Sequence, residues 1–131
     1  MLFKIWMMGY GSKSKEKVIS LLKNNEIELV IDIRRWPTSK REEFKKEELE
    51  KWLNENGIKY VWMGDLLGGY RNGGFEKYMK TQNFKEGIKK LLEFSLNQKT
   101  CLLCLEENIK ACHRRFIAEY LKCMGLEIIN I

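Results

Sequence analysis

Residues 104–115, CLEENIKACHRR, hold the densest group of side chains that could carry out chemistry. The segment contains Cys104 and Cys112, two of the four cysteines, together with His113, the only histidine, and two adjacent arginines. The thiolate form of cysteine is both the nucleophile and the metal ligand, and neighbouring cationic groups favour it. The segment therefore predicts one of four arrangements: a redox pair, a metal site, an assisted nucleophile, or a strand leading into a helix.

A redox pair within the sequence CLLC is excluded by strand geometry. Cys101 and Cys104 lie three residues apart in a predicted strand, so their side chains point to opposite faces of the sheet. Thioredoxin-like pairs lie instead at the junction between a loop and a helix. We expect Cys101 in the core and Cys104, near the end of the strand, at a cleft.

Cys112 lies where the last predicted helix, residues 111–125, begins. The free N–H groups and partial positive charge of a helix N-terminus lower the pKa of an exposed thiol. Cys104 and Cys112 are therefore the candidate nucleophiles, with Glu106 and His113 as candidate acid/base groups. Glu106 could also orient His113 or accept hydrogen bonds from an arginine. The structural alternative is that Cys112 and His113 only cap and pack the helix.

A zinc site made by Cys104, Cys112 and His113 is the metal alternative, with Glu106 or water as a fourth ligand. The two cysteines are eight residues apart, and adjacent residues of a helix diverge by about 100°. This pattern matches no recognised ligand spacing. We therefore assign no metal and no cofactor, and keep a metal-binding regulator as an alternative.

The segment DIRRWPTS, residues 32–39, invites a phosphate-binding interpretation. Asp32 ends a predicted strand, arginines follow it, and Ser39 offers a hydroxyl group. Arginine forks suit phosphate and carboxylate groups. In the alternative, Asp32 accepts hydrogen bonds from loop N–H groups and the arginines face water. The full candidate set for anion binding is Asp32, Arg34, Ser39, Arg41, Arg71 and Arg114.

The glycine-rich segment GDLLGGYRNGGF, residues 64–75, follows the third predicted strand. Its glycines do not follow the order of a dinucleotide-binding fingerprint. We interpret Gly68, Gly69 and Tyr70 as part of a flap over the cleft; a plain connection is the alternative. Pro37, the only proline, contributes to the cleft in the second loop, and the sequence leaves the isomer of Trp36–Pro37 open.

Strand and helix patterns alternate along the whole chain. Apolar runs at residues 2–8, 28–35, 58–63, 99–105 and 126–131 predict strands, and helical patterns lie between them. Apolar runs without alternation indicate strands covered on both faces. The sequence predicts one α/β domain, residues 1–131, with a mostly parallel five-stranded sheet and helices on both faces, a three-layer Rossmann-like architecture. The polar loops after the first four strands should then share one edge of the sheet.

The composition is that of a soluble globular protein: 44% hydrophobic and 32% charged residues, with a net charge of +6. No apolar run is long enough to span a membrane, and the first residues lack a signal-peptide cleavage site. We expect a cytoplasmic protein with reduced thiols and no membrane partner. The basic charge favours an anionic small molecule or nucleic acid as partner. The oligomeric state is left open.

These motifs together resemble the domain of unknown function 488 (DUF 488) family. The matching stretches are GYGS after the first strand, DIRRWPTSKREEF, NGIKYVWMGDLLGG and CLEENIKACHRRFIAEYL. Two departures are Gly9, where the family often has threonine or serine, and Lys40 preceding Arg41. The resemblance implies a compact parallel α/β fold with a cleft formed by these motifs, and it implies no particular reaction.

Three functions compete. The first is an enzyme acting on a phosphorylated or nucleic-acid-like substrate through a Cys/His/Arg site, with Arg34, Arg71 and Arg114 as the anion clamp. The spacing from Cys104 to Arg114 differs from the short cradle of cysteine phosphatases. The second is a non-enzymatic nucleic-acid-binding module. The third is the metal-binding regulator.

Overall fold

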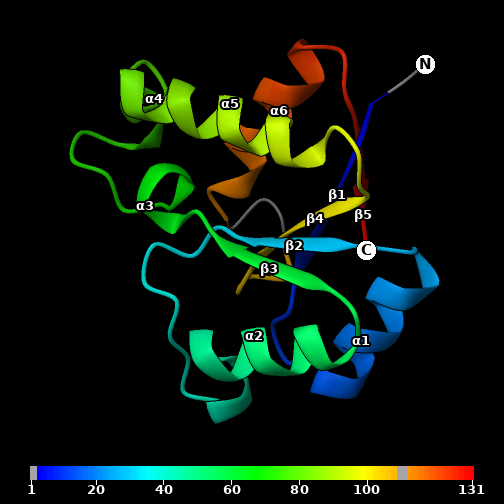
Figure 1. The fold of residues 1–131 in the computed structure, drawn as a ribbon. Helices are drawn as coiled ribbons and strands as arrows, with labels where there is room; N and C mark the ends of the chain where they lie inside the picture. The colour runs from blue at the N-terminus through cyan, green and yellow to red at the C-terminus, as the bar shows by residue number, and fades with distance from the viewer. Residues whose placement is uncertain (1–2, 109–111) are drawn as a thin grey trace.

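The computed structural model describes residues 3–108 and 112–131 (Figure 1). The strands are β1 (Lys4–Gly9), β2 (Leu29–Asp32), β3 (Lys59–Trp62), β4 (Thr100–Cys104) and β5 (Glu127–Asn130). The α-helices are α1 (Lys15–Asn24), α2 (Lys46–Glu55), α3 (Gly64–Leu67), α4 (Phe75–Tyr78), α5 (Gln82–Ser95) and α6 (Arg114–Cys123), and η1 (Glu42–Phe44) is a 3₁₀ helix.

The five strands form one sheet in the order β3-β2-β4-β1-β5, and every pairing between them is parallel. The predicted α/β class and five-stranded sheet are thereby confirmed. The most central strand, β4, is buried at all five positions. Its register aligns Leu103 with Asp32 of β2 and Cys104 with Gly9 of β1, so these three strands end side by side.

Helices cover both faces of the sheet (Figure 1). α1 and α2 pack on one face, where Val18 and Leu22 of α1 are buried. The Ser14 side chain caps α1 by accepting a hydrogen bond from the N–H of Lys17 at 3.0 Å. The opposite face is covered by α5 and α6, together with the short helices α3 and α4. This is the predicted three-layer arrangement.

Alternation along β4 separates its two cysteines. Cys101 lies in the core between the sheet and α1–α2, and Cys104 lies in the core on the α5–α6 side. Both cores are apolar, which explains why the strands are continuous apolar runs in the sequence. The expectation that Cys101 and Cys104 face opposite sides is confirmed, and Cys101 is a fully buried core residue.

The segment 64–75 is more ordered than the predicted glycine-rich flap, because it contains α3 and leads directly into α4. Leu67 and Phe75 are buried, and the Tyr78 hydroxyl donates to the carbonyl of Leu66 at 2.7 Å. These contacts attach the segment to the α5–α6 core. Between the two short helices Tyr70 is exposed, so only the middle of the segment projects from the protein.

The direction of the chain changes at β4. The connections that leave β1 and β2 run through α1 and α2 on one face, whereas β4 is followed by α6 on the other face. In open parallel sheets, a crevice forms at the carboxyl ends of strands whose connections diverge in this way. The fold therefore predicts a site at the ends of β2, β4 and β1.

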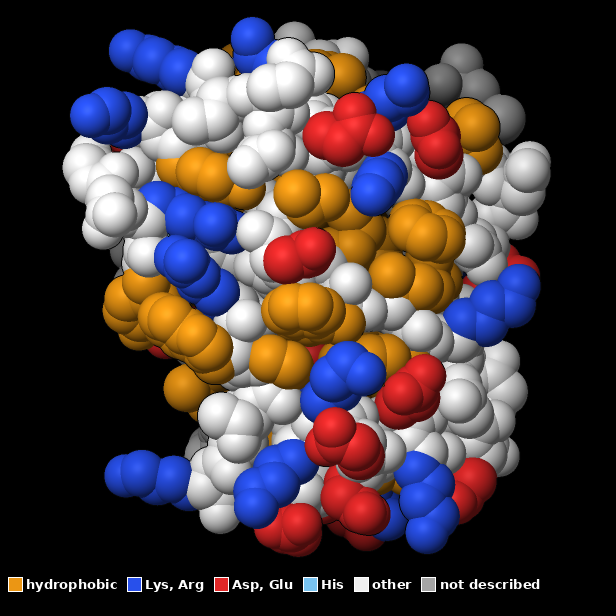
Figure 2. Space-filling model, turned by 60° about the vertical axis from the view of Figure 1, so that its left-hand side comes forward, with side chains coloured by type: hydrophobic (Ala, Val, Ile, Leu, Met, Phe, Trp, Pro, Cys, Tyr) orange, Lys and Arg blue, Asp and Glu red, His pale blue; other side chains and the backbone are white. Residues whose placement is uncertain are grey.

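The surface combines both signs of charge. Figure 2 shows Lys and Arg side chains interspersed with Asp and Glu over the drawn face, with hydrophobic side chains exposed between them. Some opposite charges pair directly, as Lys45 does with Glu42 at 2.8 Å. In the part of the chain that the structure describes, no helix has the length and apolar character needed to span a membrane.

Candidate functional site

A cavity of about 300 Å³ opens at the carboxyl ends of β2 and β4, and we call it the cysteine cavity. It lies at the crevice that the change of chain direction predicts. It is formed by the loops after β2, β3 and β4 and the start of α6. Its lining residues are Arg34, Arg35, Trp36, Thr38, Gly69, Tyr70, Cys104, Leu105, Glu106, Cys112 and His113.

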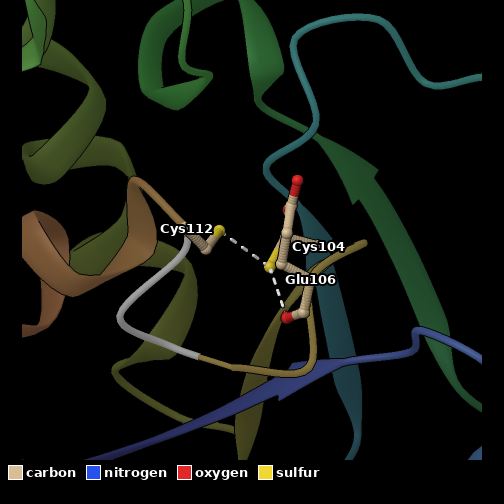
Figure 3. A group of neighbouring side chains, drawn as sticks. All are labelled: Cys104, Glu106 and Cys112. Carbon is tan, nitrogen blue, oxygen red and sulfur yellow. Dashed lines mark hydrogen bonds between the residues drawn. The ribbon is translucent and has the colours of Figure 1, made fainter.

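Cys104 and Cys112 meet at the base of this cavity. Their sulfur atoms lie 3.1 Å apart and face one another, one from the end of β4 and the other from the residue pair before α6 (Figure 3). The Cys104 sulfur also lies 3.7 Å from the carbonyl oxygen of Glu106. Both thiols are free, and both side chains are almost completely buried except toward the cavity.

The two thiols have opposite protonation preferences. The hydrogen bond from Cys104 lowers the pKa of Cys112, and His113 and the backbone N–H of Arg114, 3.5 Å from the sulfur, act in the same direction against burial. The same contact with Cys112, together with burial, raises the pKa of Cys104. These contacts favour the thiolate form on Cys112 and the thiol form on Cys104, which then donates to it.

His113 adjoins the thiolate. Its Nδ1 lies 3.7 Å from the Cys112 sulfur, and its ring packs 5.2 Å from that of Phe75. Its Nε2 is buried and has no hydrogen-bond partner among the described residues. A β-carbon at Gly69 would come 3.1 Å from His113 Nδ1, so the glycine allows the backbone at this position to pack directly against the imidazole.

Arg34 is held by Asp32 at the end of β2. Its Nε and Nη2 donate to the two carboxylate oxygens at 2.9 and 2.7 Å, and Nη1 donates to the carbonyl of Phe44 at 2.7 Å. The Asp32 carboxylate also accepts a hydrogen bond from the Tyr60 hydroxyl at 2.6 Å. Arg34 reaches the wall of the cysteine cavity, but most of its donors have acceptors within the protein.

The remaining arginines predicted to bind anions brace backbone carbonyls. Arg41 donates to the carbonyls of Gly11 and Lys13 at 3.0 and 2.6 Å, and the Ser39 hydroxyl accepts the N–H of Arg41 at 3.1 Å. Neither Ser39 nor Arg41 lines the cysteine cavity.

Arg71 and Arg114 hold the two loops that flank the cavity. Arg71 donates to the carbonyls of Gly68 and Asp65 at 2.9 and 2.6 Å. Arg114, which is 2% exposed, donates through Nη2 to the carbonyls of Glu106 and Glu107 at 3.0 and 2.8 Å. Glu106 therefore accepts a hydrogen bond from Arg114 through its backbone carbonyl and not through its carboxylate.

A family comparison covers nearly the whole site. The family model described as Domain of unknown function DUF488 matches residues 14–121. The chain belongs to this family. All residues that line the cysteine cavity lie inside the DUF488 match, and Gly9 precedes it. Comparisons with curated proteins and with solved structures found no match.

Gly9 lets the first loop of this DUF488 chain reach the cysteine loop. A β-carbon there would lie 1.7 Å from the carbonyl oxygen of Glu106, so any other residue would displace the chain that follows Cys104. Ser12 continues the contact through its N–H, which donates to the Glu107 carboxylate at 2.8 Å. The departure from threonine or serine at position 9 therefore has a steric basis.

Pro37, predicted to contribute to the cleft, is not among the residues that line the cysteine cavity. The described residues contain no cis peptide bond, so Trp36–Pro37 is trans. The Pro37 carbonyl accepts a hydrogen bond from the N–H of Lys46 at 3.0 Å, which connects the loop to the start of α2.

Four residues that line the cavity are absent from the predicted site: Arg35, Trp36, Thr38 and Leu105. Arg34 and Arg35 are adjacent in sequence, but their side chains diverge: Arg34 pairs with the buried Asp32, and Arg35 donates through Nη1 to the carbonyl of Tyr70. For Trp36 the sequence does hold a signal, because this tryptophan lies in a polar loop and outside any apolar pattern. The structure leaves it 59% exposed. The pairing of the Cys104 and Cys112 sulfurs was also missed.

The donor atoms of Cys104, Glu106 and Cys112 lie within 4.8 Å of one another. Two thiolates and a carboxylate suit zinc. Among the described residues, Glu106 joins the two cysteines in this group and His113, a ligand in the predicted set, does not, although its Nδ1 lies 3.7 Å from the Cys112 sulfur. The geometry therefore accommodates the metal alternative as well as a nucleophile.

Proposed function

We propose that this DUF488 protein is an enzyme that uses the Cys112 thiolate as a nucleophile on a small phosphorylated substrate, with nucleotides as the favoured class. The observation that carries the proposal is the position of the Cys112 sulfur in the cysteine cavity, in contact with Cys104, His113 and the N–H of Arg114. A thiolate supported by several donors beside a helix N-terminus has the environment of reactive cysteines.

The chemistry is a two-step phosphoryl transfer. The Cys112 thiolate attacks phosphorus, so that an S–P bond forms while the P–O bond to the leaving group breaks. The leaving oxygen takes a proton from His113 or Glu106, the two acid/base candidates at the cavity. Water then attacks the phosphocysteine, the S–P bond breaks, phosphate leaves, and the acid/base group regains a proton from that water.

Arg35 is the proposed anion-binding side chain. Its Nη1 contacts the carbonyls of Gly69 and Tyr70, and the rest of its guanidinium group lies at the cavity with no further hydrogen bond to a described residue. Arg34 adds positive charge from the wall, and Arg114 acts by fixing the loop that carries Glu106. Arginine is suited to this role because its charge is permanent and its fork matches phosphate oxygens.

The aromatic rings at the mouth favour a nucleotide over inorganic phosphate. Trp36 and Tyr70 are 59% and 79% exposed, with ring centroids 5.4 Å apart. An adjoining cavity of about 400 Å³ shares these rings and Arg35 with the cysteine cavity, and it adds Arg71 and Lys77. A flat base can stack on the exposed rings while its phosphate lies at Arg35.

Turnover of 4-nitrophenyl phosphate and of AMP by the purified protein tests the proposal. We expect Cys112→Ser to lower turnover by orders of magnitude, as loss of a catalytic nucleophile does, while Cys123→Ser, at an exposed thiol, leaves it unchanged. Retained turnover in folded Cys112→Ser protein would exclude the covalent mechanism. No release of phosphate from either compound by the wild-type protein would exclude these substrates.

Zinc binding is a second candidate function, favoured by the cluster of donors from Cys104, Glu106 and Cys112. If the cluster binds zinc, added Zn²⁺ raises the melting temperature of the chelator-treated protein, and Cys104→Ser removes most of this stabilisation. An unchanged melting temperature at a large excess of Zn²⁺ would rule this candidate out.

A further inference from the structure

The Cys104 and Cys112 sulfurs are arranged for a reaction that phosphoryl transfer does not need. A nucleophilic thiolate requires a hydrogen-bond donor, which a hydroxyl or amide could supply, but here the donor is a second thiol 3.1 Å away. A disulfide needs the sulfurs at about 2.05 Å, so an approach of roughly one ångström completes the bond. Both cysteines line the cysteine cavity and both are reduced in the structure.

We propose that Cys112 and Cys104 are the attacking and resolving thiols of a reaction with hydroperoxides that ends in a Cys104–Cys112 disulfide. The inference shares Cys112 with the proposed function, but it does not depend on the phosphorylated substrate. Hydrogen peroxide is about the size of two water molecules and fits a cavity of about 300 Å³ with ample room.

The reaction balances without any other reagent. The Cys112 thiolate attacks one peroxide oxygen, an S–O bond forms, the O–O bond breaks, and the departing oxygen takes a proton from water or His113. Cys112 is then a sulfenic acid. The Cys104 sulfur attacks the Cys112 sulfur, an S–S bond forms, the S–O bond breaks, and hydroxide leaves with the proton of Cys104 as water. The two sulfurs lose two electrons and the peroxide gains them.

The division of roles follows from the surroundings of each sulfur. Cys112 receives hydrogen bonds from Cys104 and from the N–H of Arg114, which stabilise its thiolate. Cys104 remains a thiol, held at the end of β4 beside the Glu106 carbonyl (Figure 3). A resolving thiol at this position intercepts the sulfenic acid before further oxidation can make the damage irreversible.

The other two cysteines cannot take part in this reaction. Cys101 lies on the opposite face of β4, in the core against α1 and α2. Cys123 is exposed at the last residue of α6, a helix that begins two residues after Cys112. Cys123 therefore serves as an internal reference for the reactivity of an ordinary surface thiol.

Peptide mapping after oxidation tests the inference on the full chain. The reduced, chelator-treated protein is mixed with equimolar hydrogen peroxide, blocked with N-ethylmaleimide and digested with trypsin. Cleavage after Lys99, Lys110 and Arg114 separates Cys112 from Cys104, which shares a peptide with Cys101. We expect the two peptides to be joined by a disulfide that dithiothreitol reverses, and fragmentation of the joined peptides to assign Cys104.

Variants separate the two steps. Cys104→Ser should abolish the link and leave Cys112 as a sulfenic acid that dimedone traps, whereas Cys123→Ser should keep the link. If this variant fails to fold, the sulfenic acid can be trapped in the wild-type protein instead. Dimedone is then present from the start of the oxidation, and labelled Cys112 is measured before the disulfide has formed. Oxidation of Cys112 no faster than that of Cys123, or a link that joins Cys112 to Cys123, would overturn the inference.

Turnover of 4-nitrophenyl phosphate by the same samples distinguishes this inference from the proposed function. A disulfide that forms in a protein without phosphatase turnover supports the inference and removes the proposed function. Turnover without a disulfide overturns the inference alone. If both hold, oxidation stops turnover completely and dithiothreitol restores it, because the disulfide consumes the nucleophile.

Discussion

At the scale of single residues, Cys101 and Cys112 show that the contacts of a buried thiol decide whether its pKa is raised or lowered. Both side chains are buried, and burial alone disfavours a thiolate. For Cys101, burial raises the pKa to about 12, and the opposing effect of the Arg114 charge is smaller. For Cys112, the hydrogen bonds from Cys104 and from the N–H of Arg114 outweigh burial and lower the pKa. The contact with Cys104, together with the position just before α6, provides this difference.

The pH dependence of alkylation by iodoacetamide tests this difference. A thiol with a lowered pKa remains a thiolate as the pH falls below the ordinary value of about 8.5. The Cys112 rate, resolved by mass mapping, should therefore stay high at a pH where the Cys123 rate has dropped. Cys104→Ala removes the main donor and should move the Cys112 inflection to higher pH. Equal profiles for Cys112 and Cys123 would contradict the assignment of the thiolate.

Tyr70 has a left-handed backbone, with φ of 60°, and an exposed ring. This conformation costs about 1–2 kcal/mol for a residue with a side chain, and glycine avoids the cost. Tyr70→Gly should therefore leave the free energy of unfolding within about 1 kcal/mol of the wild-type value. Loss of a stacking ring worth about 1–3 kcal/mol should weaken AMP binding by about 5- to 150-fold.

Glu26 supplies the matched control, because it has φ of 57° and lies before β2, away from the cysteine cavity. Glu26→Gly should have the same small effect on unfolding and none on AMP affinity, as measured by calorimetry. Equal AMP affinity in Tyr70→Gly and wild-type protein would mean that the Tyr70 ring contributes nothing to binding.

At the scale of elements, four loops converge at one edge of the sheet, as strand order and the parallel arrangement require. The sequence could predict this convergence, because apolar runs and helical periodicity identify the alternation of β and α elements. It could not predict the partners of the arginines. Arg34 and Arg35 are adjacent in sequence, and only the packed loop shows that Arg34 pairs with Asp32 while Arg35 faces the cavity.

The contact between the Cys104 and Cys112 sulfurs could not be predicted from sequence patterns for a similar reason. Strand periodicity correctly places Cys104 on the face of β4 opposite to Cys101, and the structure shows that this is the α6 side. The short distance between the two sulfurs depends on how the chain leaves Cys104. Two contacts fix that part of the chain: the close packing of Gly9 against the Glu106 carbonyl, and the hydrogen bond that Arg114 donates to the same carbonyl. Long-range contacts of this kind leave no periodic signal in the chain.

The buried network of Asp32, Arg34 and Tyr60 joins β2 and β3 to the second loop. Asp32 is fully buried, and its carboxylate accepts from both side chains. Asp32→Asn leaves the Arg34 charge without its counterion, which costs about 3–5 kcal/mol in such pairs. Urea unfolding should show this loss, and Asp65→Asn, at an exposed carboxylate, should change the free energy of unfolding little. A loss below about 1 kcal/mol for Asp32→Asn would contradict the role of the pair.

At the scale of the whole molecule, charge distribution separates a small-molecule site from a nucleic-acid surface. The net charge is +6, yet acidic side chains lie among the basic ones over much of the face drawn in Figure 2. The basic groups at the two adjoining cavities are few: Arg34 lies at the wall of the cysteine cavity, and Arg35, Arg71 and Lys77 lie beside the exposed rings of Trp36 and Tyr70. This arrangement suits a nucleotide and offers a single strand few phosphate contacts.

The salt dependence of affinity tests this distinction. Each phosphate contact with a single strand contributes about −0.7 to the slope of log K against log salt concentration. Contacts from Arg35, Arg71 and Lys77 would therefore give a slope of about −2 for a short oligonucleotide. Arg35→Gln should make the slope shallower and lower AMP affinity, whereas Lys51→Gln, on the exposed side of α2, should alter neither. A slope several times steeper, unaffected by Arg35→Gln, would show that binding follows an extended basic surface and would favour the nucleic-acid-binding module over the enzyme.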